Sequence, residues 1–320
     1  MRTVLLAGVV LGIVVVLGWL AALTLSSGRA LRTRNAFLLR RGALEDFSWT
    51  PSHVPPDFSV ERNRAPAAIE TAVTSAGIQS IADDWQRALA LVGMLIQHWQ
   101  REGAIRSDLA TIYREIVAGG GDCSDYVRVY LAAASMSNIF CRQWAFSING
   151  FGDRGHTFVE VFDRKRNAWK FLDVHNNVYA VRAGTDQPFS ALELRQALTD
   201  APSTVEFRAA GPGRLGFSHF DRLLEYYKRG AAEWSLWWGN DVVSRDRVPF
   251  DVAIARWSGR FQHWIRAAFT PWPKLVAYET DGNRPQISRM ERLRRQVVGL
   301  LLFLLVLLVA LIVLLAARVY

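Results

Sequence analysis

A cysteine, a histidine and an aspartate follow one another along this chain in an order that suits nucleophilic catalysis: Cys123, His156 and Asp173. A thiolate can attack a carbonyl carbon, an imidazole can carry the proton, and a carboxylate can fix the tautomer of the imidazole. Such a set would transfer an acyl group from a carboxamide or peptide bond to water or an amine. We predict neither a cofactor nor a metal ion for this chemistry.

The residues around Cys123 predict a helix start. A glycine run, residues 119–121, leads into Asp122, a good N-cap, and Asp125 stands three residues later as in a capping box. Apolar residues then recur every three or four positions from Tyr126. Cys123 would therefore be the first helical residue, where unpaired N–H groups and the helix dipole favour a thiolate. Because the two aspartates oppose this effect, a partnered imidazolium is expected to supply much of the activation.

His156 opens an alternating run, residues 156–162, that predicts a strand, and a polar turn and a second strand follow. If residues 164–167 form a tight hairpin turn, His156 pairs opposite His175, and Asp173 becomes its diagonal neighbour on the same face. Diagonal neighbours lie about 7–8 Å apart at the backbone, a distance that a carboxylate and an imidazole can span. A bulge that shifts the register by one residue would separate them.

These motifs resemble the core of the transglutaminase-like cysteine superfamily over roughly residues 80–180. The matching pieces are Gly121-Asp-Cys123-Ser-Asp-Tyr126, Ile139-Phe-Cys-Arg142, His156-Thr-Phe-Val-Glu160 and Trp169-Lys-Phe-Leu-Asp173. The resemblance implies an α+β papain-like fold, in which a helix carrying the cysteine packs on an antiparallel sheet carrying the histidine and aspartate. It also implies that Cys123 is the nucleophile, His156 the general base and acid, and Asp173 the orienting carboxylate.

The chain departs from the family pattern at Asn138, where glycine is common, and at Cys141, where alanine is common. Asn tolerates a left-handed backbone, so the fold is expected to survive this change. The side chain that stabilises the oxyanion has several candidates upstream of the cysteine: Trp85, Gln97, Trp99 and Gln100. The backbone N–H of Cys123 is the one donor that we name.

Other interpretations of the same residues remain open. His175 could replace His156 as the base, since the hairpin places both on one face. A zinc site of Cys123, Cys141 and the two histidines lacks the Cys-x-x-Cys or His-x-x-x-His spacing of such sites. We interpret Cys141 as a small core residue rather than a disulfide partner, and Glu160 as a solvated strand residue.

Two uncharged apolar runs, residues 3–25 and 297–317, are each long enough to cross a bilayer as a helix of roughly 20 residues. The first is longer than the apolar region of a signal peptide and lacks an Ala-x-Ala site, so we interpret it as a retained anchor. Gly8 and Gly12 form a Gly-x-x-x-Gly pattern. This pattern would allow close approach to the second span or to another copy of the chain in a homodimer.

Between the spans we predict an extended, proline-containing tether over residues 26–68, a transglutaminase-like domain over 69–200, and a Trp- and Arg-rich extension over 204–295. Within this extension, apolar residues recur with helical spacing over residues 254–269. The predicted helix would lie in the membrane interface or pack on the domain.

The net charge of +9 comes almost wholly from arginine, a bias that indicates a GC-rich bacterial genome. Much of this charge flanks the spans, so nucleic acid is not an expected partner. Five arginines stand on the domain side of each span against one on the other side. This asymmetry predicts a two-pass protein of the bacterial inner membrane whose central domain faces the cytoplasm, with the periplasm as the alternative.

The sequence therefore predicts a membrane-anchored cysteine enzyme that acts on a polypeptide or amide substrate. The competing hypothesis is a non-catalytic, membrane-tethered binding scaffold of the same fold, in an envelope or exopolysaccharide assembly system.

Overall fold

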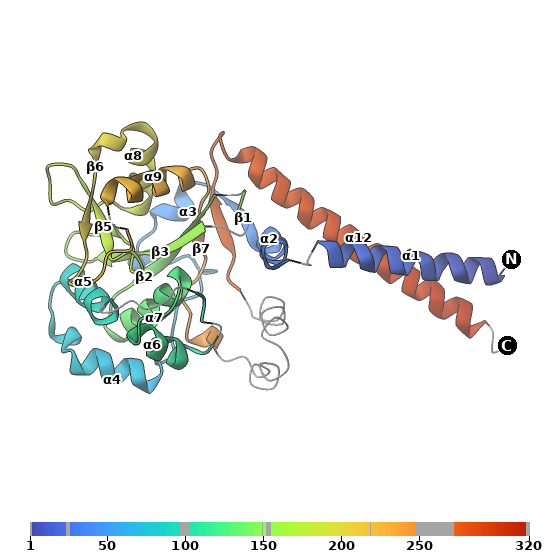
Figure 1. Cartoon of the computed structure of the whole chain (residues 1–320), viewed down its shortest axis with the longest axis horizontal. Coiled ribbons are helices and arrows are strands. Elements are labelled where there is room, and N and C mark those ends of the chain that lie inside the picture. The colour runs from blue at the N-terminus through green and yellow to red at the C-terminus, as the bar shows by residue number, and fades with distance from the viewer. Residues whose placement is uncertain are drawn as a thin grey trace.

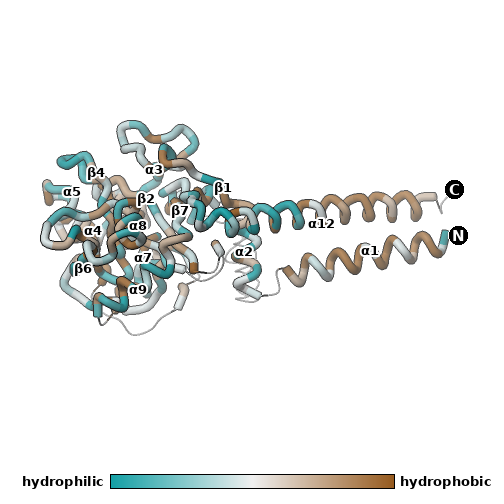
Figure 2. Tube along the Cα trace, turned by 90° about the horizontal axis from the view of Figure 1, so that it is seen from above, coloured by the Kyte–Doolittle hydropathy of each residue, from teal (hydrophilic) through white to brown (hydrophobic). Residues whose placement is uncertain are grey.

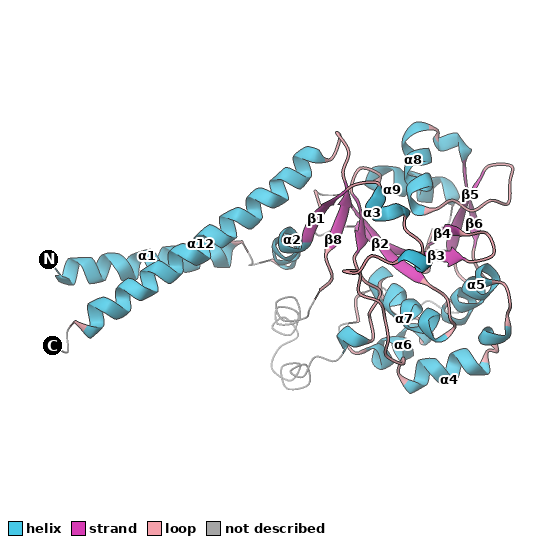
Figure 3. Cartoon of the chain, turned by 180° about the vertical axis from the view of Figure 1, so that it is seen from behind, coloured by secondary structure: helices cyan, strands magenta, loops and turns pink. Residues whose placement is uncertain are grey.

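The computed structural model describes residues 2–23, 26–96, 103–105, 107–148, 150–151, 155–217, 219–246 and 272–317. The protein is α+β: a mixed sheet lies between two groups of helices, and a pair of long helices projects from one side (Figure 1). The sheet and the elements that cover it are seen from behind in Figure 3.

The helices are α1 (Arg2–Ala22), α2 (Ser27–Leu38), α3 (Glu45–Ser48), α4 (Ala67–Ser75), α5 (Asp84–Leu95), α6 (Leu109–Val117), α7 (Cys123–Met136), α8 (Ala191–Asp200), α9 (Phe220–Gly230) and α12 (Arg284–Ala316). The strands are β1 (Leu39–Gly42), β2 (Cys141–Ser147), β3 (Gly155–Asp163), β4 (Ala168–Leu172), β5 (Val178–Arg182), β6 (Val205–Ala209), β7 (Trp234–Trp237) and β8 (Leu275–Tyr278). Short 3₁₀ turns occur at Pro51–His53, Ile78–Ser80, Pro202–Thr204 and Ser244–Asp246.

The large sheet has the strand order β1-β8-β7-β2-β3-β4, with β1 and β8 parallel and the other neighbours antiparallel. A second sheet pairs β5 with β6. The hairpin register predicted for β3 and β4 is confirmed, because Asp163 pairs with Ala168 and Val159 pairs with Leu172. Continued along β3, this register places His156 opposite the position of His175.

Alternate residues of β3 enter two different cores, one on each face of the sheet. The face toward α4 to α7 is aliphatic and takes Val159 and Val161. The opposite face takes Phe158 and Phe162 and is largely aromatic; its other members include Trp144, Phe171, Tyr227 and Trp234. Both faces of the strand are therefore buried, which the alternating sequence pattern did not indicate.

The segment 26–68 is folded into the domain, so the prediction of an extended tether is wrong. It contributes β1, an edge strand of the large sheet, and it buries Phe47 and Phe58 in the aromatic core. Trp49 lies against Phe58 and Trp169 with ring centroids 4.8 and 5.7 Å apart. Burying three aromatic side chains stabilises a compact path for this segment, despite its prolines.

The described parts of the segment 204–295 also belong to the same domain rather than to an appended extension. Strands β7 and β8 lie between β1 and β2 in the large sheet, and β6 completes the small one. Composition alone did not reveal these pairings, because they join residues far apart in the sequence. The helix predicted over residues 254–269 lies outside the described residues.

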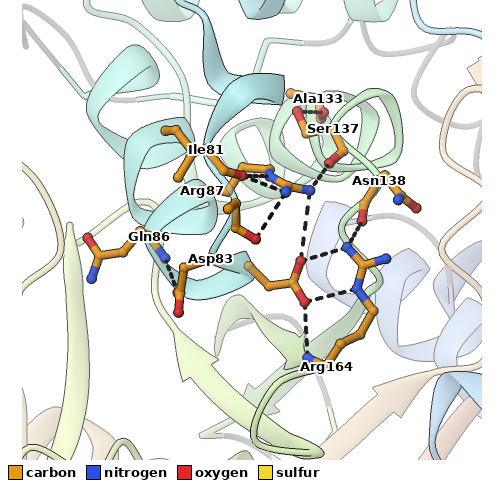
Figure 4. A network of polar contacts seen from close by, with 10 residues as sticks. Ile81, Asp83, Gln86, Arg87, Ala133, Ser137, Asn138 and Arg164 are labelled. Atoms are coloured by element: carbon orange, nitrogen blue, oxygen red, sulfur yellow. Dashed lines mark hydrogen bonds and ion pairs between the residues drawn. The ribbon is translucent and has the colours of Figure 1, made fainter.

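The turn between α7 and β2 is held by two arginines (Figure 4). Arg87 donates to the carbonyl of Ser137, at 2.8 Å. Arg164 pairs with Asp84 at 2.6 Å and donates to the carbonyl of Asn138 at 3.0 Å. Asn138 has a φ of 53°, so the left-handed backbone that the sequence suggested at this position is present.

Glu160 is fully buried, so its interpretation as a solvated strand residue is wrong. Its carboxylate accepts hydrogen bonds from Arg142 Nε at 2.8 Å, from the Trp144 indole and from the backbone N–H of Ala191 at 2.5 Å. The Arg142 guanidinium lies 3.9 Å from the ring centroid of Trp169, and burial lowers the pKa of Arg142. Arg142 and Glu160 lie in the aromatic core, because each face of β3 is covered by a core of its own.

Arg142→Ala should destabilise the domain by about 3–5 kcal/mol, because it leaves a buried carboxylate without its cation. The free energy of unfolding of the full chain in detergent, measured by denaturant titration, checks this value. Arg64→Ala is the control, because that arginine has 77% of its side-chain surface exposed. The double variant Arg142→Met, Glu160→Leu should recover only part of the loss, because it leaves the Trp144 indole and the Ala191 N–H without an acceptor. A loss below about 1 kcal/mol for Arg142→Ala would contradict the expectation.

Helices α1 and α12, of 21 and 33 residues, are long and apolar enough to cross a membrane (Figure 2). They run antiparallel, and Arg2 Nη2 lies 2.7 Å from the carbonyl oxygen of Leu314. A Cβ atom on Gly12 would lie 3.2 Å from Leu307, whereas one on Gly8 would have no neighbour within 4 Å. Gly12 therefore allows close approach to the second span, one of the two roles predicted for it.

Helix α12 begins well before the predicted span at residue 297. In its first turns Ile287 and Met290 are buried against β1 and β8, together with Leu39 and Ala277. One continuous helix thus leads from the edge of the sheet into the apolar segment (Figure 1).

Candidate active site

The start of α7 has the geometry that its sequence predicts. Asp122 Oδ1 accepts hydrogen bonds from the backbone N–H groups of Ser124 and Asp125, at 2.9 and 3.1 Å, and Asp125 bonds back to the N–H of Asp122 at 3.2 Å. The capping box is complete, and Cys123 is the first helical residue. Within the described part of the chain, no hydrogen bond uses the backbone N–H of Cys123. This N–H can therefore serve as an oxyanion donor.

Asp125 also ties the helix start to the segment before it. Its Oδ2 accepts from the backbone N–H of Ile105 at 2.7 Å, and Gly103 forms a bridge with Gly121. Burial, together with the negative charge of Asp122, raises the pKa of Asp125 to about 6. The position of Cys123 thus depends on residues 103–105 as well as on its own helix.

His156 and Asp173 are in direct contact. The Nε2 atom of His156 lies 2.8 Å from Oδ2 of Asp173, and both side chains are buried. Asp173 Oδ2 also accepts from the Tyr227 hydroxyl at 2.7 Å and from Asn176 Nδ2 at 2.5 Å, and Oδ1 accepts from the Asn176 backbone at 3.1 Å. Burial would raise the pKa of Asp173, but the charge of His156 and hydrogen bonds from His156 and Tyr227 hold it below its usual value.

Cys123 lies close enough to His156 to influence its charge. Burial would lower the pKa of His156, but the charge of Asp173, the interaction with Cys123 and the hydrogen bond to Asp173 raise it to about 10. Because Nε2 faces the carboxylate, Nδ1 is the ring nitrogen left for the thiol. The structure therefore brings the three predicted residues together: His156 bonds to Asp173, and Cys123 is partly exposed close by.

The three side chains come from different layers of the domain. Cys123 is carried by α7, on the aliphatic face of the sheet, whereas His156 shares the aromatic face of β3 with Phe158. Asp173 directly follows β4 and forms a bridge with Val178, which opens β5. The candidate site thus lies where the start of α7, on one face of the sheet, meets the start of β3 and the end of β4.

His175 lies beside the candidate site, next to His156, but has a different environment. Its ring centroid is 6.0 Å from that of His156 and 5.3 Å from that of Tyr126. Both ring nitrogens are buried, and within the described residues neither has a hydrogen-bond partner. Burial and the positive charge of His156 lower the pKa of His175 to about 4. Without a bonded carboxylate, His175 is the weaker candidate for the base.

Sequence reasoning missed three residues near Cys123, His156 and Asp173. Asn176 and Tyr227 bond to Asp173, and the ring of Tyr226 lies 5.8 Å from that of His156. Asn176 stands only three residues after Asp173 and could have been found as a turn residue. The tyrosines belong to α9, and no local pattern indicates that this helix would meet Asp173.

The structure describes only some of the other residues that the sequence put forward as candidates. Trp85 is buried in α5 with its ring 5.4 Å from that of Tyr179, which indicates core packing. Gln97, Trp99 and Gln100 lie outside the described residues.

Both cysteines are free thiols; Cys141 is buried, and burial raises its pKa. Across the described ranges, no group of three or more His, Cys, Asp or Glu side chains is placed to hold a metal ion.

Comparison with protein families, with curated proteins and with solved structures gave no match to this chain.

Proposed function

We propose that this protein is a membrane-anchored cysteine enzyme of the transglutaminase-like type, which cleaves a carboxamide or peptide bond and passes the acyl group to an acceptor. The observation that supports this most is that the His156 imidazole bonds to the buried Asp173 carboxylate and also interacts with the nearby Cys123. Both neighbours raise the pKa of His156, so the imidazole can stay protonated beside Cys123.

In the proposed reaction the thiolate of Cys123 attacks the carbonyl carbon, and negative charge develops on the carbonyl oxygen. The free backbone N–H at the start of α7 can stabilise that charge. His156 then gives its proton to the departing amine, and a thioester on Cys123 remains. Asp173 stays ionised throughout, orienting the imidazole and stabilising its charged form.

The fold is compatible with this proposal. A helix that carries the cysteine packs on a sheet in which the antiparallel neighbours β3 and β4 present the histidine and lead into the aspartate. This arrangement supports the proposal. The polar network around Asp173 is fully buried, as expected for a preorganised site.

Reaction with p-nitrophenyl acetate tests the proposal without knowledge of the natural substrate. The full chain in detergent should release a burst of p-nitrophenolate, and mass spectrometry should locate one acetyl group on Cys123. Cys123→Ser should lose the burst, whereas Cys141→Ser should keep it. A folded protein with intact thiols but no burst would instead favour the non-catalytic scaffold.

We further propose that the domain faces the cytoplasm of a bacterial cell, on the strength of the arginine asymmetry around the two spans. Alkaline phosphatase fused after Tyr320 should then be active, and the same enzyme fused after Asp200 should be inactive. Fluorescent-protein fusions at the two positions should show the opposite pattern. Activity only after Asp200 would place the domain in the periplasm, where Cys123 is more exposed to oxidation.

A further inference from the structure

Tyr226 lies against the proposed base but takes no part in holding Asp173. Its ring is 5.8 Å from that of His156, at an interplanar angle of 70°. Phe146 and Phe217 pack on the same ring, at 5.3 and 5.4 Å. The next residue, Tyr227, is fully buried, whereas Tyr226 is only partly buried. Tyr226 is therefore an ordered aromatic side chain beside the imidazole, within reach of solvent.

The Tyr226 hydroxyl is a neutral donor close to the reacting groups. Burial, together with the negative charges of Cys123 and Asp173, raises the pKa of Tyr226, so the phenol keeps its proton. Its described hydrogen bond runs to the carbonyl oxygen of Gly155, is exposed and is long, at 3.4 Å. A contact of this length and exposure is easily replaced by a bridging water.

Gly155 supplies a matching acceptor. It directly precedes His156 at the exposed start of β3, so its carbonyl lies next to the proposed base. A Cβ atom at this position would lie 2.0 Å from the carbonyl oxygen of Phe146, so no other residue fits without a backbone shift. Because residue 155 is glycine, no side chain of its own covers its carbonyl group at the start of β3.

We propose that the Tyr226 hydroxyl and the Gly155 carbonyl position the water that hydrolyses the Cys123 thioester, so that water is the preferred acyl acceptor. This inference rests on the function proposed above and specifies its second step. A water molecule has two hydrogens and two lone pairs. One hydrogen can bond to His156 and the other to Gly155, while one lone pair accepts from Tyr226 and the other attacks the acyl carbon.

The hydrolytic step is balanced as follows. Neutral His156 takes one proton from the water as the oxygen forms a bond to the acyl carbon. The C–S bond then breaks, and its electron pair returns to Cys123 as thiolate. The products are a carboxylic acid, the thiolate and the imidazolium, which is the state that began the cycle.

An amine acceptor fits this arrangement less well. An amine has one lone pair, which it uses in the attack, and it then has none left to accept a hydrogen bond from Tyr226. Tyr226 thus acts as a positioning residue, and its hydroxyl selects water over an amine as the acyl acceptor. Removing it should change the ratio of the two products, an effect that general loss of structure would not produce.

The test uses the full chain in detergent with p-nitrophenyl acetate and glycinamide as the amine probe. In wild type, acetate should exceed acetylglycinamide at moderate glycinamide. Tyr226→Phe keeps the ring and removes the hydroxyl; the burst rate should stay the same, and steady-state release should fall about tenfold, as for one lost hydrogen bond. The proportion of acetylglycinamide should rise. Tyr179→Phe, which removes a hydroxyl from β5, is the matched control and should behave as wild type.

Three outcomes would overturn the inference: no change in Tyr226→Phe, an equal slowing of burst and steady state, or an unchanged product ratio. The rate of Cys123 alkylation by iodoacetamide reports whether the variant still has an assembled thiol and imidazole pair. If Tyr226→Phe fails this check, Tyr226→Gln supplies a second variant, which should retain part of the hydrolysis because its amide can also donate. If wild type itself gives no burst, the proposed function fails together with this step.

Discussion

Asp173→Asn should lower the rate of Cys123 acetylation by about 10⁴, the loss seen when an orienting acid is removed from a triad. In the structure this carboxylate is the bonded partner of His156 Nε2, at 2.8 Å. An amide at position 173 would lose the charge that raises the pKa of His156 to about 10, so the imidazolium would lose its proton at a lower pH. Cys123 would then lose the neighbouring cation over part of the pH range.

The sign of the pH dependence follows from the same contact. A folded pKa of about 10 lies above the ordinary value of 6.5, so the protonated form of His156 stabilises the wild-type site fully below 6.5. That contribution is lost as the pH rises through about 10. In Asp173→Asn the loss should occur at lower pH, and the pH profile of the acetylation burst measures the shift.

The controls for Asp173→Asn separate orientation from folding. Asp186→Asn changes an aspartate with 94% of its side-chain surface exposed and should leave the burst unchanged. Circular dichroism should show that Asp173→Asn remains folded. If acetylation survives Asp173→Asn but disappears in His175→Ala, then His175 is the base and the role proposed for His156 is wrong.

Cys123 should react with iodoacetamide faster than Cys141 by on the order of 10³-fold in the folded protein. Cys123 is partly exposed at a helix start and lies close to His156, whereas Cys141 is buried in β2 and its pKa is raised by burial. His156→Ala should slow the alkylation of Cys123 by at least about tenfold and leave that of Cys141 unchanged. Peptide mass spectrometry of timed samples gives both rates from one experiment.

Unfolding supplies the matched control for this comparison. In concentrated urea the two thiols should alkylate at similar rates, because neither keeps its environment. Equal rates at the two cysteines in the native protein, unaffected by His156→Ala, would contradict the catalytic interpretation. Such a result would favour a membrane-tethered scaffold that keeps the fold without turnover.

Two features of the candidate site were predictable because they depend on short stretches of chain. The capping box at Asp122 and Asp125 is a contact between residues three apart, so residue types alone specify it. The β3–β4 register follows from the length of one turn and from strand alternation, which together place Asp173 near His156. The two long apolar helices were likewise predictable from length and composition.

Other features depended on contacts between distant parts of the chain. Tyr227 bonds to Asp173 across 54 positions, and β7 and β8 enter the sheet between β1 and β2. Periodicity predicts that a residue is buried but does not name its neighbour. For the same reason the sequence could not show that Glu160 is buried against Arg142, since that depends on a second core covering the other face of β3.

The sequence by itself therefore determined the start of α7, the β3–β4 hairpin and the apolar spans, because each is decided by interactions within a few turns or one hairpin. Only the tertiary structure decided which imidazole has a carboxylate partner, because His156 and His175 are equivalent by register and differ in their surroundings. It also decided that residues 26–68 and the described parts of 204–295 complete one domain. Burial of their aromatic side chains and pairing of their strands are gained only when the whole chain is folded.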